Sequence, residues 1–230
     1  MSTDQNKCPF SGSDIVTNTI PVPDRIAKLP VLRGFHVPRF VEKVNGEFDF
    51  RIMSRDFLIA AVKLKLCWVC GEPLGRNKSF VIGPMCGITR TSAEPPSHHE
   101  CAVYSAMACP FLTNPKMKRR DHENLKKITH SAGESIDRNP GVSAIWTCDN
   151  FERFSDGRGG ILFKVGEPNK VEWYREGRLA TRAEVQASID SGCPALRAIC
   201  DKESTPERCE QSHRQMDDMV SILEQYLPNE

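Results

Sequence analysis

Apolar residues recur along this chain with two periods, one typical of helices and one typical of strands. Residues 54–65 follow the helical period: Ser54 can cap a helix, and the next apolar positions fall on one stripe, formed by Leu58, Ala61, Val62 and Leu66. Residues 98–109 form a second predicted helix, which ends before Pro110. These stretches predict two helices in the first half of the chain.

Between the two predicted helices, the pattern changes to short β-type runs. Residues 79–82 and 88–91 are rich in β-branched and aromatic side chains, and they flank a Gly-Pro-Met-Cys-Gly turn. This arrangement predicts a hairpin. After it, Ser97 and Glu100 have the spacing of a capping box, so we expect the second helix to begin there.

The second half of the chain shows the same two periods in a different order. Three β-type runs come first, and three helical stretches follow, the first of which opens with a capping box formed by Thr181 and Glu184. The predicted strands are residues 144–148, 160–165 and 170–175, and the predicted helices are residues 181–191, 194–202 and 206–227.

Proline and turn residues suggest how these elements are grouped. Four prolines between residues 20 and 50 favour extended, non-helical backbone, which predicts an arm lying against a domain. The Asn-Pro-Gly sequence at residues 139–141 marks a boundary. We therefore predict three parts. Residues 1–20 form a flexible tail, residues 21–139 contain the arm, the first helix and a cysteine-rich module, and residues 140–230 form a small domain of strands and helices.

Composition excludes several classes of protein. The 230 residues are 39% hydrophobic and 27% charged, which is typical of a soluble globular chain and not of a disordered one. We find no run of 18 or more apolar residues and no signal-like N-terminus, so we expect no membrane span and a cytoplasmic location.

Cysteine spacing gives the strongest chemical signal. Cys67 and Cys70 form a C-x-x-C followed by a glycine, and His98 and Cys101 lie three residues apart at the predicted start of a helix. Two thiols from a tight turn and two ligands from one helical turn can meet at one ion, which predicts a structural Cys₃His zinc site. Five other cysteines are scattered, and we interpret them as small buried apolar residues: Cys8, Cys148, Cys193, Cys200 and Cys209.

The spacing leaves other ligand sets open. Cys86 or His99 could replace His98, and Cys109 shares a helical face with Cys101. A redox role for the C-x-x-C is disfavoured, because Gly-Glu-Pro after it is a poor start for the helix that a thioredoxin-like site needs. A zinc deaminase is excluded, because its C-x-x-C follows the histidine motif.

The order of knuckle, hairpin and ligand-bearing helix resembles the treble-clef zinc-finger group over residues 67–110, on Cys67, Cys70, His98 and Cys101. Most of the chain also resembles uncharacterised bacterial and bacteriophage proteins, through stretches such as Cys-Trp-Val-Cys-Gly-Glu-Pro-Leu-Gly at residues 67–75 and Trp-Tyr-Arg-Glu-Gly-Arg-Leu-Ala-Thr at residues 173–181. The expected fold class is therefore α+β, with a treble-clef-like zinc module, an extended arm and a small C-terminal β-hairpin and helical domain.

A catalytic alternative uses neighbouring residues. His99, Asn114 and His122 have the order and approximate spacing of an HNH-type nuclease, a group that also resembles a treble clef and uses a divalent metal. The chain departs from that pattern, because no aspartate precedes the first histidine and no Gly-rich turn follows it. We therefore expect a non-enzymatic protein and keep the nuclease as the alternative.

Charge is unevenly distributed although the net charge is only +1. From residue 63 to 130 there are eleven Lys and Arg against five Asp and Glu, a balance of +6, and from residue 181 onward five against ten, a balance of −5. We expect nucleic acid or a protein as partner, with phosphate contacts from Lys116, Lys118, Arg119 and Arg120. Apolar residues at heptad spacing in the last helix also allow a homodimer.

Overall fold

Over the part of the chain that the computed structural model describes, residues 20–53, 55–116, 132–133, 136 and 138–229, helices and strands are mixed, as expected for an α+β protein. The helices are α1 (Asp24–Ala27), α2 (Arg55–Lys63), α3 (Pro84–Thr89), α4 (His99–Ala108), α5 (Pro110–Thr113), α6 (Arg182–Cys200) and α7 (Pro206–Glu224). The strands are β1 (Val31–Leu32), β2 (Phe35–His36), β3 (Val41–Val44), β4 (Glu47–Met53), β5 (Lys78–Ile82), β6 (Thr91–Ser92), β7 (Ser143–Cys148), β8 (Phe151–Ser155), β9 (Ile161–Val165), β10 (Pro168–Arg175) and β11 (Arg178–Leu179).

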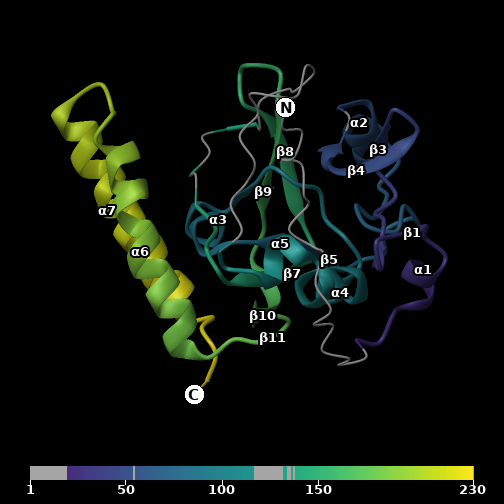
Figure 1. The fold of residues 1–230 in the computed structure, drawn as a ribbon. Helices are drawn as coiled ribbons and strands as arrows, with labels where there is room; N and C mark the ends of the chain where they lie inside the picture. Colours follow the sequence, from purple (N-terminus) through teal and green to yellow (C-terminus); the bar gives the residue numbers. More distant parts are fainter. Residues whose placement is uncertain (1–19, 54, 117–131, 134–135, 137, 230) are drawn as a thin grey trace, which may run out of the picture.

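A four-stranded antiparallel sheet in the order β11-β10-β7-β5 lies at the centre of the molecule (Figure 1). Every residue of β7 is buried, because both faces of this strand are covered. Successive side chains of a strand point to opposite faces. Trp146 therefore belongs to the largest cluster of buried residues, whereas Ile145 packs with Ala102 and Ala106 of α4 on the other face.

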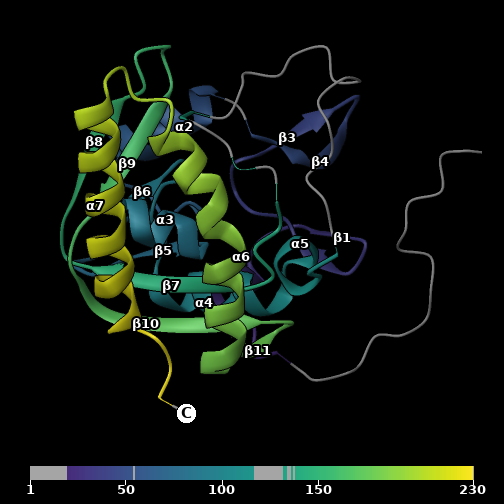
Figure 2. The ribbon, with the colours of Figure 1, turned by 90° about the vertical axis from the view of Figure 1, so that its left-hand side faces the viewer.

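The largest cluster, called the main core, is the buried cluster that contains Phe80, Trp146 and Phe163. It also includes residues of α3, α6 and α7, and it draws on a three-stranded sheet in the order β6-β9-β8. Figure 2 shows α6 and α7 side by side across one side of the molecule. The two long helices thus close the main core from outside.

The N-terminal arm contains more regular structure than the prolines predicted. Residues 24–27 form α1, a single helical turn that begins after Pro23, and two short antiparallel hairpins follow, β1–β2 and β3–β4. Proline is tolerated at the edge of such elements because its missing N–H falls where no partner is needed. The arm is therefore a series of small turns and hairpins, with one helical turn among them.

The hairpin predicted for residues 79–91 is wrong. Residues 79–82 are strand, but residues 84–89 form α3, and β6 pairs with β9 instead of β5. Pro84 occupies the first turn of α3, where its missing N–H has no helical partner to lose, and Arg90 ends the helix with a left-handed φ of 53°. The proline at the start of this segment and the left-handed residue at its end favour a helix more strongly than its β-branched composition favours a strand.

The C-terminal elements are largely as predicted, but the break expected at Pro194 is absent and two strands, β8 and β11, were not predicted. Residues 182–200 form one helix, α6, although Pro194 suggested a break. An internal proline costs the helix one hydrogen bond, and burial of Ile189 and Leu196 in the main core offsets this loss. The strand β8 was not predicted, since four of its five residues are exposed and give no apolar alternation.

The central sheet includes strands from both sides of the boundary proposed at residue 140, because β5 pairs with β7 over five residue pairs. The division into two domains stays a prediction, and this pairing is the contact that separate folding would have to break. Among the described residues, no helix is long and apolar enough to cross a membrane.

Candidate metal centre

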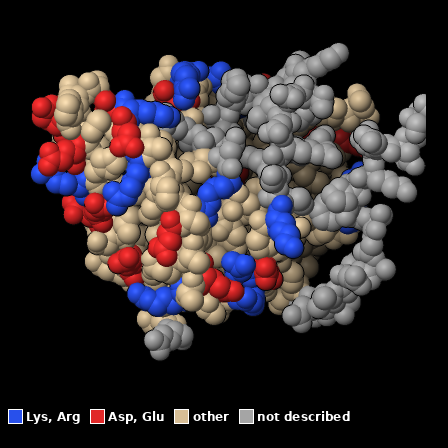
Figure 3. All heavy atoms as spheres, turned by 60° about the vertical axis from the view of Figure 1, so that its left-hand side comes forward, with Lys and Arg blue, Asp and Glu red and all other residues tan. Residues whose placement is uncertain are grey.

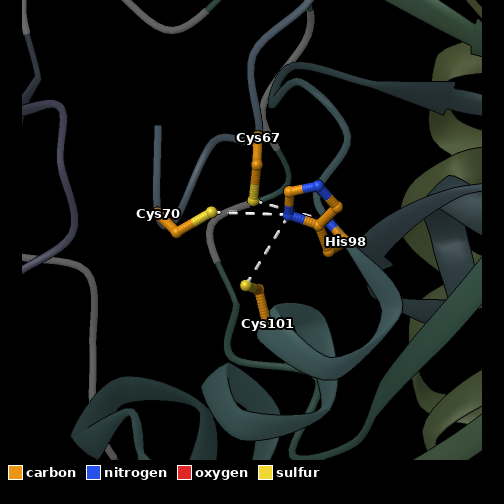
Figure 4. A group of neighbouring side chains, drawn as sticks. All are labelled: Cys67, Cys70, His98 and Cys101. Carbon is orange, nitrogen blue, oxygen red and sulfur yellow. Dashed lines mark hydrogen bonds between the residues drawn. The ribbon is translucent and has the colours of Figure 1, made fainter. Parts of the chain in front are cut away.

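Four side chains from two parts of the chain converge at one point beside α4. Cys67, Cys70, His98 and Cys101 each offer one donor atom, and these atoms all lie within 4.8 Å of one another (Figure 4). Both thiols of the C-x-x-C are buried, and Cys101 is fully buried. The four residues predicted from spacing are thus brought together in an arrangement that could hold a metal ion.

The first two sulfurs are held by a tight turn, called the knuckle and formed by residues 67–74. The amide of Gly71 donates to the carbonyl of Cys67 at 2.9 Å, and the amide of Cys67 donates to the carbonyl of Glu72 at 2.8 Å. Gly71 has φ of +77°, and a Cβ there would lie 2.5 Å from Cγ of Arg39. Only glycine fits this conformation and this close approach.

The other two donors are held by the start of α4 and by the central sheet. Ser97 exchanges both backbone hydrogen bonds with Ser79 of β5, at 2.8 and 2.9 Å. The next residue, His98, is the N-cap of α4, and Cys101 lies in the first turn of this helix. The predicted capping box of Ser97 and Glu100 does not form, because Ser97 lies one residue before the N-cap position.

A hydrogen bond to the backbone of the knuckle fixes the orientation of the His98 imidazole. Nε2 of His98 lies 3.0 Å from the carbonyl oxygen of Pro73. A carbonyl can only accept, so Nε2 carries the proton and the lone pair of Nδ1 points toward the sulfurs. Nδ1 lies 3.4 Å from Sγ of Cys70 and 4.0 Å from Sγ of Cys101.

The two distances from Nδ1 of His98 to these sulfurs are close to those around a tetrahedral metal ion. Zinc bonds of about 2.3 Å to sulfur and about 2.0 Å to nitrogen imply donor-to-donor distances of about 3.6 Å along each tetrahedral edge. The observed nitrogen-to-sulfur distances of 3.4 and 4.0 Å bracket that length. A set of three sulfurs and one correctly oriented nitrogen is therefore consistent with zinc.

The three thiols share protons with one another. Hydrogen bonds from Cys101 and Cys70 lower the pKa of Cys67, and the backbone amides of Cys70 and His98 lower it further. The bond to Cys67 is also the largest cause of the raised pKa of Cys101. For Cys70, a bond with Cys101 lowers the pKa, but the bond to Cys67 and burial outweigh it and raise the value to about 11. A divalent cation would take the place of the shared protons.

The alternative ligands lie elsewhere. Within the described residues, neither Cys86 nor Cys109 belongs to the cluster. His99 points to the sheet instead, where its Nε2 lies 2.5 Å from a carboxylate oxygen of Glu172, which also pairs with Lys170 at 3.0 Å. The four residues that the spacing favoured are the ones that the fold brings together.

The residues predicted for nucleic-acid binding and nuclease chemistry are only partly described. Lys116 is exposed, and its amide donates to the side-chain oxygen of Asn114 at 3.0 Å. Three residues of the basic run and one histidine of the nuclease pattern lie outside the described residues, namely Lys118, Arg119, Arg120 and His122. Their proposed roles stay predictions from sequence.

Sequence reasoning missed the groups that surround the cluster. Ile26 of α1 is fully buried against the cysteines, and Arg25 bridges Glu72 and Glu100. Pro73 contributes only its backbone carbonyl. No pattern in the sequence could have revealed these contacts, because they join residues that are distant in the chain or use backbone atoms that every residue has.

No known protein family, curated protein or solved structure matches this chain. The resemblances to treble-clef zinc fingers and to bacterial and bacteriophage proteins remain predictions from sequence. Any function therefore rests on the geometry of the site itself.

Proposed function

We propose that this protein binds one structural zinc ion through Cys67, Cys70, His98 and Cys101 and acts as a non-enzymatic binding module. The observation that carries the proposal is the convergence of all four donors within 4.8 Å, with three of them buried. A closed shell of four protein ligands leaves no position for a reactive water, so such an ion supports folding and not catalysis.

The local architecture supports a treble-clef-like arrangement without reproducing all of it. A knuckle supplies two ligands, and a helix supplies the other two from its N-terminal end. Between them α3 occupies the place of a second hairpin strand, and the pairing of Ser79 with Ser97 links the two halves. The zinc would thus connect the knuckle to the edge of the central sheet.

The nuclease alternative has less support from the described residues. His99 would have to hold a metal ion or activate water, but its Nε2 is engaged by Glu172. Incubation of the full chain with DNA or RNA and Mg²⁺, Mn²⁺ or Ni²⁺ tests it. Cleavage that disappears in both His99→Ala and His122→Ala would restore the enzyme hypothesis.

Nucleic acid is the partner that the charge distribution favours. The balance of +6 falls on residues 63–130, the stretch of sequence that carries the four donors, and Lys116 is exposed at the start of the basic run. By contrast, the face formed by α6 and α7 shows both signs interspersed (Figure 3), including the pairs Arg197–Asp217 and Arg214–Glu210. A surface of mixed sign attracts phosphates weakly.

Salt titration of binding to a mixed-sequence oligonucleotide tests this partner. Alanine at Lys116, Lys118, Arg119 and Arg120 should weaken binding and reduce the slope of log K against log salt by about 0.9 for each phosphate that the chain no longer neutralises. The matched control replaces four cations of α6 and α7, at Arg182, Arg197, Arg208 and Arg214. Equal effects of both sets, or no binding by the wild type, would leave a protein as the partner.

A further inference from the structure

The N-terminal arm crosses the metal centre. Residues 23–41, called the strap, begin with α1 and continue through the β1–β2 hairpin. Ile26 of α1 is 0% exposed, and it packs directly with Cys67, Cys70 and Cys101. Ile26, with the partly buried Leu29 beside it, thus packs the strap against the cysteines that the ion would bind.

A charged contact holds α1 in place. Nε of Arg25 lies 2.8 Å from a carboxylate oxygen of Glu100, and its Nη1 pairs with Glu72. Lys28 adds a longer contact to Glu72 at 3.4 Å. Glu72 belongs to the knuckle and Glu100 to the first turn of α4, so one guanidinium joins the two elements that carry the four ligands.

The far end of the strap is attached to the same two elements. Nδ1 of His36 lies 2.8 Å from the hydroxyl of Tyr104 in α4, and the amide of Arg39 donates to the carbonyl of Val69 in the knuckle at 2.8 Å. The ring of Phe40 stacks on Trp68, with centroids 5.1 Å apart. Both ends of the strap therefore depend on the relative position of the knuckle and α4.

We propose that the strap is a cover for the metal centre, closed by Ile26 and latched by Arg25, and that its closure sets how fast chelators and thiol reagents reach the sulfurs. The inference rests on the proposed zinc site, because the ion is what fixes the knuckle against α4. The equilibrium coupling is reciprocal: the ion stabilises the closed strap, and the closed strap stabilises the bound ion.

The balance of forces explains why the strap can open. Arg25 and Glu100 have side chains 39% and 52% exposed, so water and salt screen their attraction. The strap contains only one helical turn and one two-residue-per-strand hairpin, which cannot hold their shape alone. Its closure thus depends on its contacts with the knuckle and α4, and over the metal centre these are the burial of Ile26 and the contacts of Arg25 with Glu72 and Glu100.

The first test measures zinc transfer from the loaded full chain to an excess of a chromogenic chelator. Arg25→Ala should release zinc about fivefold faster, and Ile26→Ala at least about tenfold faster. Arg76→Ala is the matched control, because Arg76 flanks the knuckle but pairs with Asp149, and its release rate should equal that of the wild type. Added salt should accelerate release from the wild type more than from Arg25→Ala, since salt screens the latch.

The second test measures tryptic cleavage within the strap, after Lys28 and Arg33. Removal of zinc by a chelator should accelerate cleavage there, whereas cleavage after Lys164 in β9 should not change. Equal strap cleavage with and without zinc would overturn the coupling.

Failure of the zinc site and failure of the strap give different results. If the purified chain binds no zinc, the proposed function fails, and alkylation of its thiols still tests the cover: Arg25→Ala and Ile26→Ala should react faster than the wild type and Arg76→Ala. If zinc binds but both variants release it at the wild-type rate, the zinc site stands and the strap proposal is wrong.

Discussion

The metal centre and the main core bury cysteine in two different ways. Around the metal centre, the buried cluster consists of Ile26 and three cysteines whose sulfurs face one another. In the main core, Cys148 is equally buried but lies among large apolar side chains such as Trp146 and Phe163. The main core gains its stability from buried apolar area, whereas the small cluster buries little, so we expect its stability to depend on a metal ion at the sulfurs.

The metal centre and the main core should therefore be destabilised by different substitutions. Loss of the ion should open the knuckle and the start of α4, and loss of a large core side chain should destabilise the sheet and α6. The two regions should affect each other where the start of α4 meets the sheet, at the pairing of Ser97 with Ser79 and at the contact of His99 with Glu172.

The largest expected effect is that of Cys67→Ser. Loss of one thiolate removes a ligand from a site whose binding free energy is about 10–16 kcal/mol in small zinc modules, so zinc should be lost and the knuckle should unfold. Hydrogen exchange should show reduced protection at the amides of Cys67 and Gly71 while residues 143–148 stay protected. Cys148→Ala is the matched control, and it should retain zinc; a zinc-bound Cys67→Ser would contradict the ligand assignment.

Trp146→Ala should have the next largest effect, and it should destabilise the sheet while the zinc site is kept. Trp146 is fully buried, covers the guanidinium of Arg90 at 4.3 Å and donates to the carbonyl of Gly166. Its truncation should cost about 3–5 kcal/mol in urea denaturation, because it leaves a large cavity. The folded fraction of the variant should still contain zinc, and loss of zinc before unfolding would show that the two regions are not separable.

Gly71→Ala probes the knuckle without removing a ligand. The new methyl group would meet Arg39 at 2.5 Å in a backbone conformation that alanine disfavours, so the affinity for zinc should fall by about 2–4 kcal/mol in chelator competition. Gly46→Ala introduces a similar backbone strain, at φ of +86°, in the β3–β4 turn outside the knuckle and with open space around it, so it should leave zinc affinity unchanged. Equal affinities for both variants would show that the close approach does not matter.

The smallest predicted effect concerns the capping box of α6, which shares no residue with the metal centre. A hydrogen bond with Arg178 and the amide of Thr181 hold the pKa of Glu184 at about 2. Because the folded pKa is depressed, this stabilisation is complete above the unfolded value of about 4.3 and is lost as the pH falls toward 2. Glu184→Gln should therefore cost about 1 kcal/mol at pH 7 and almost nothing near pH 2. Glu224→Gln at the end of α7 serves as control, and a cost that does not change with pH would contradict this origin.

Sequence reasoning succeeded where one local signal determines the result. The spacing of Cys67, Cys70, His98 and Cys101 was enough to select the four converging donors, since a knuckle and one helical turn each fix two of them. The Thr181 capping box formed as predicted for the same reason.

It failed where distant contacts determine the result. Residues 88–91 have strand composition, but packing of Ile88 in the main core and the left-handed Arg90 make them the end of a helix and a short strand. Glu100 has the spacing of a capping residue, but Arg25, 75 residues away, takes its carboxylate. Neither the core that buries Ile88 nor the arginine that pairs with Glu100 can be recognised from the local pattern, so the contacts of Arg25 and Ile26 at the cysteine cluster were not predicted.

The central claim is that one zinc ion is bound by three sulfurs and one imidazole nitrogen. X-ray absorption at the zinc edge of the purified full chain tests this directly. We predict about three scatterers at about 2.3 Å and one at about 2.0 Å, which is the pattern of a closed Cys₃His site. A folded chain without zinc, or a shell made of oxygen and nitrogen alone, would contradict the claim.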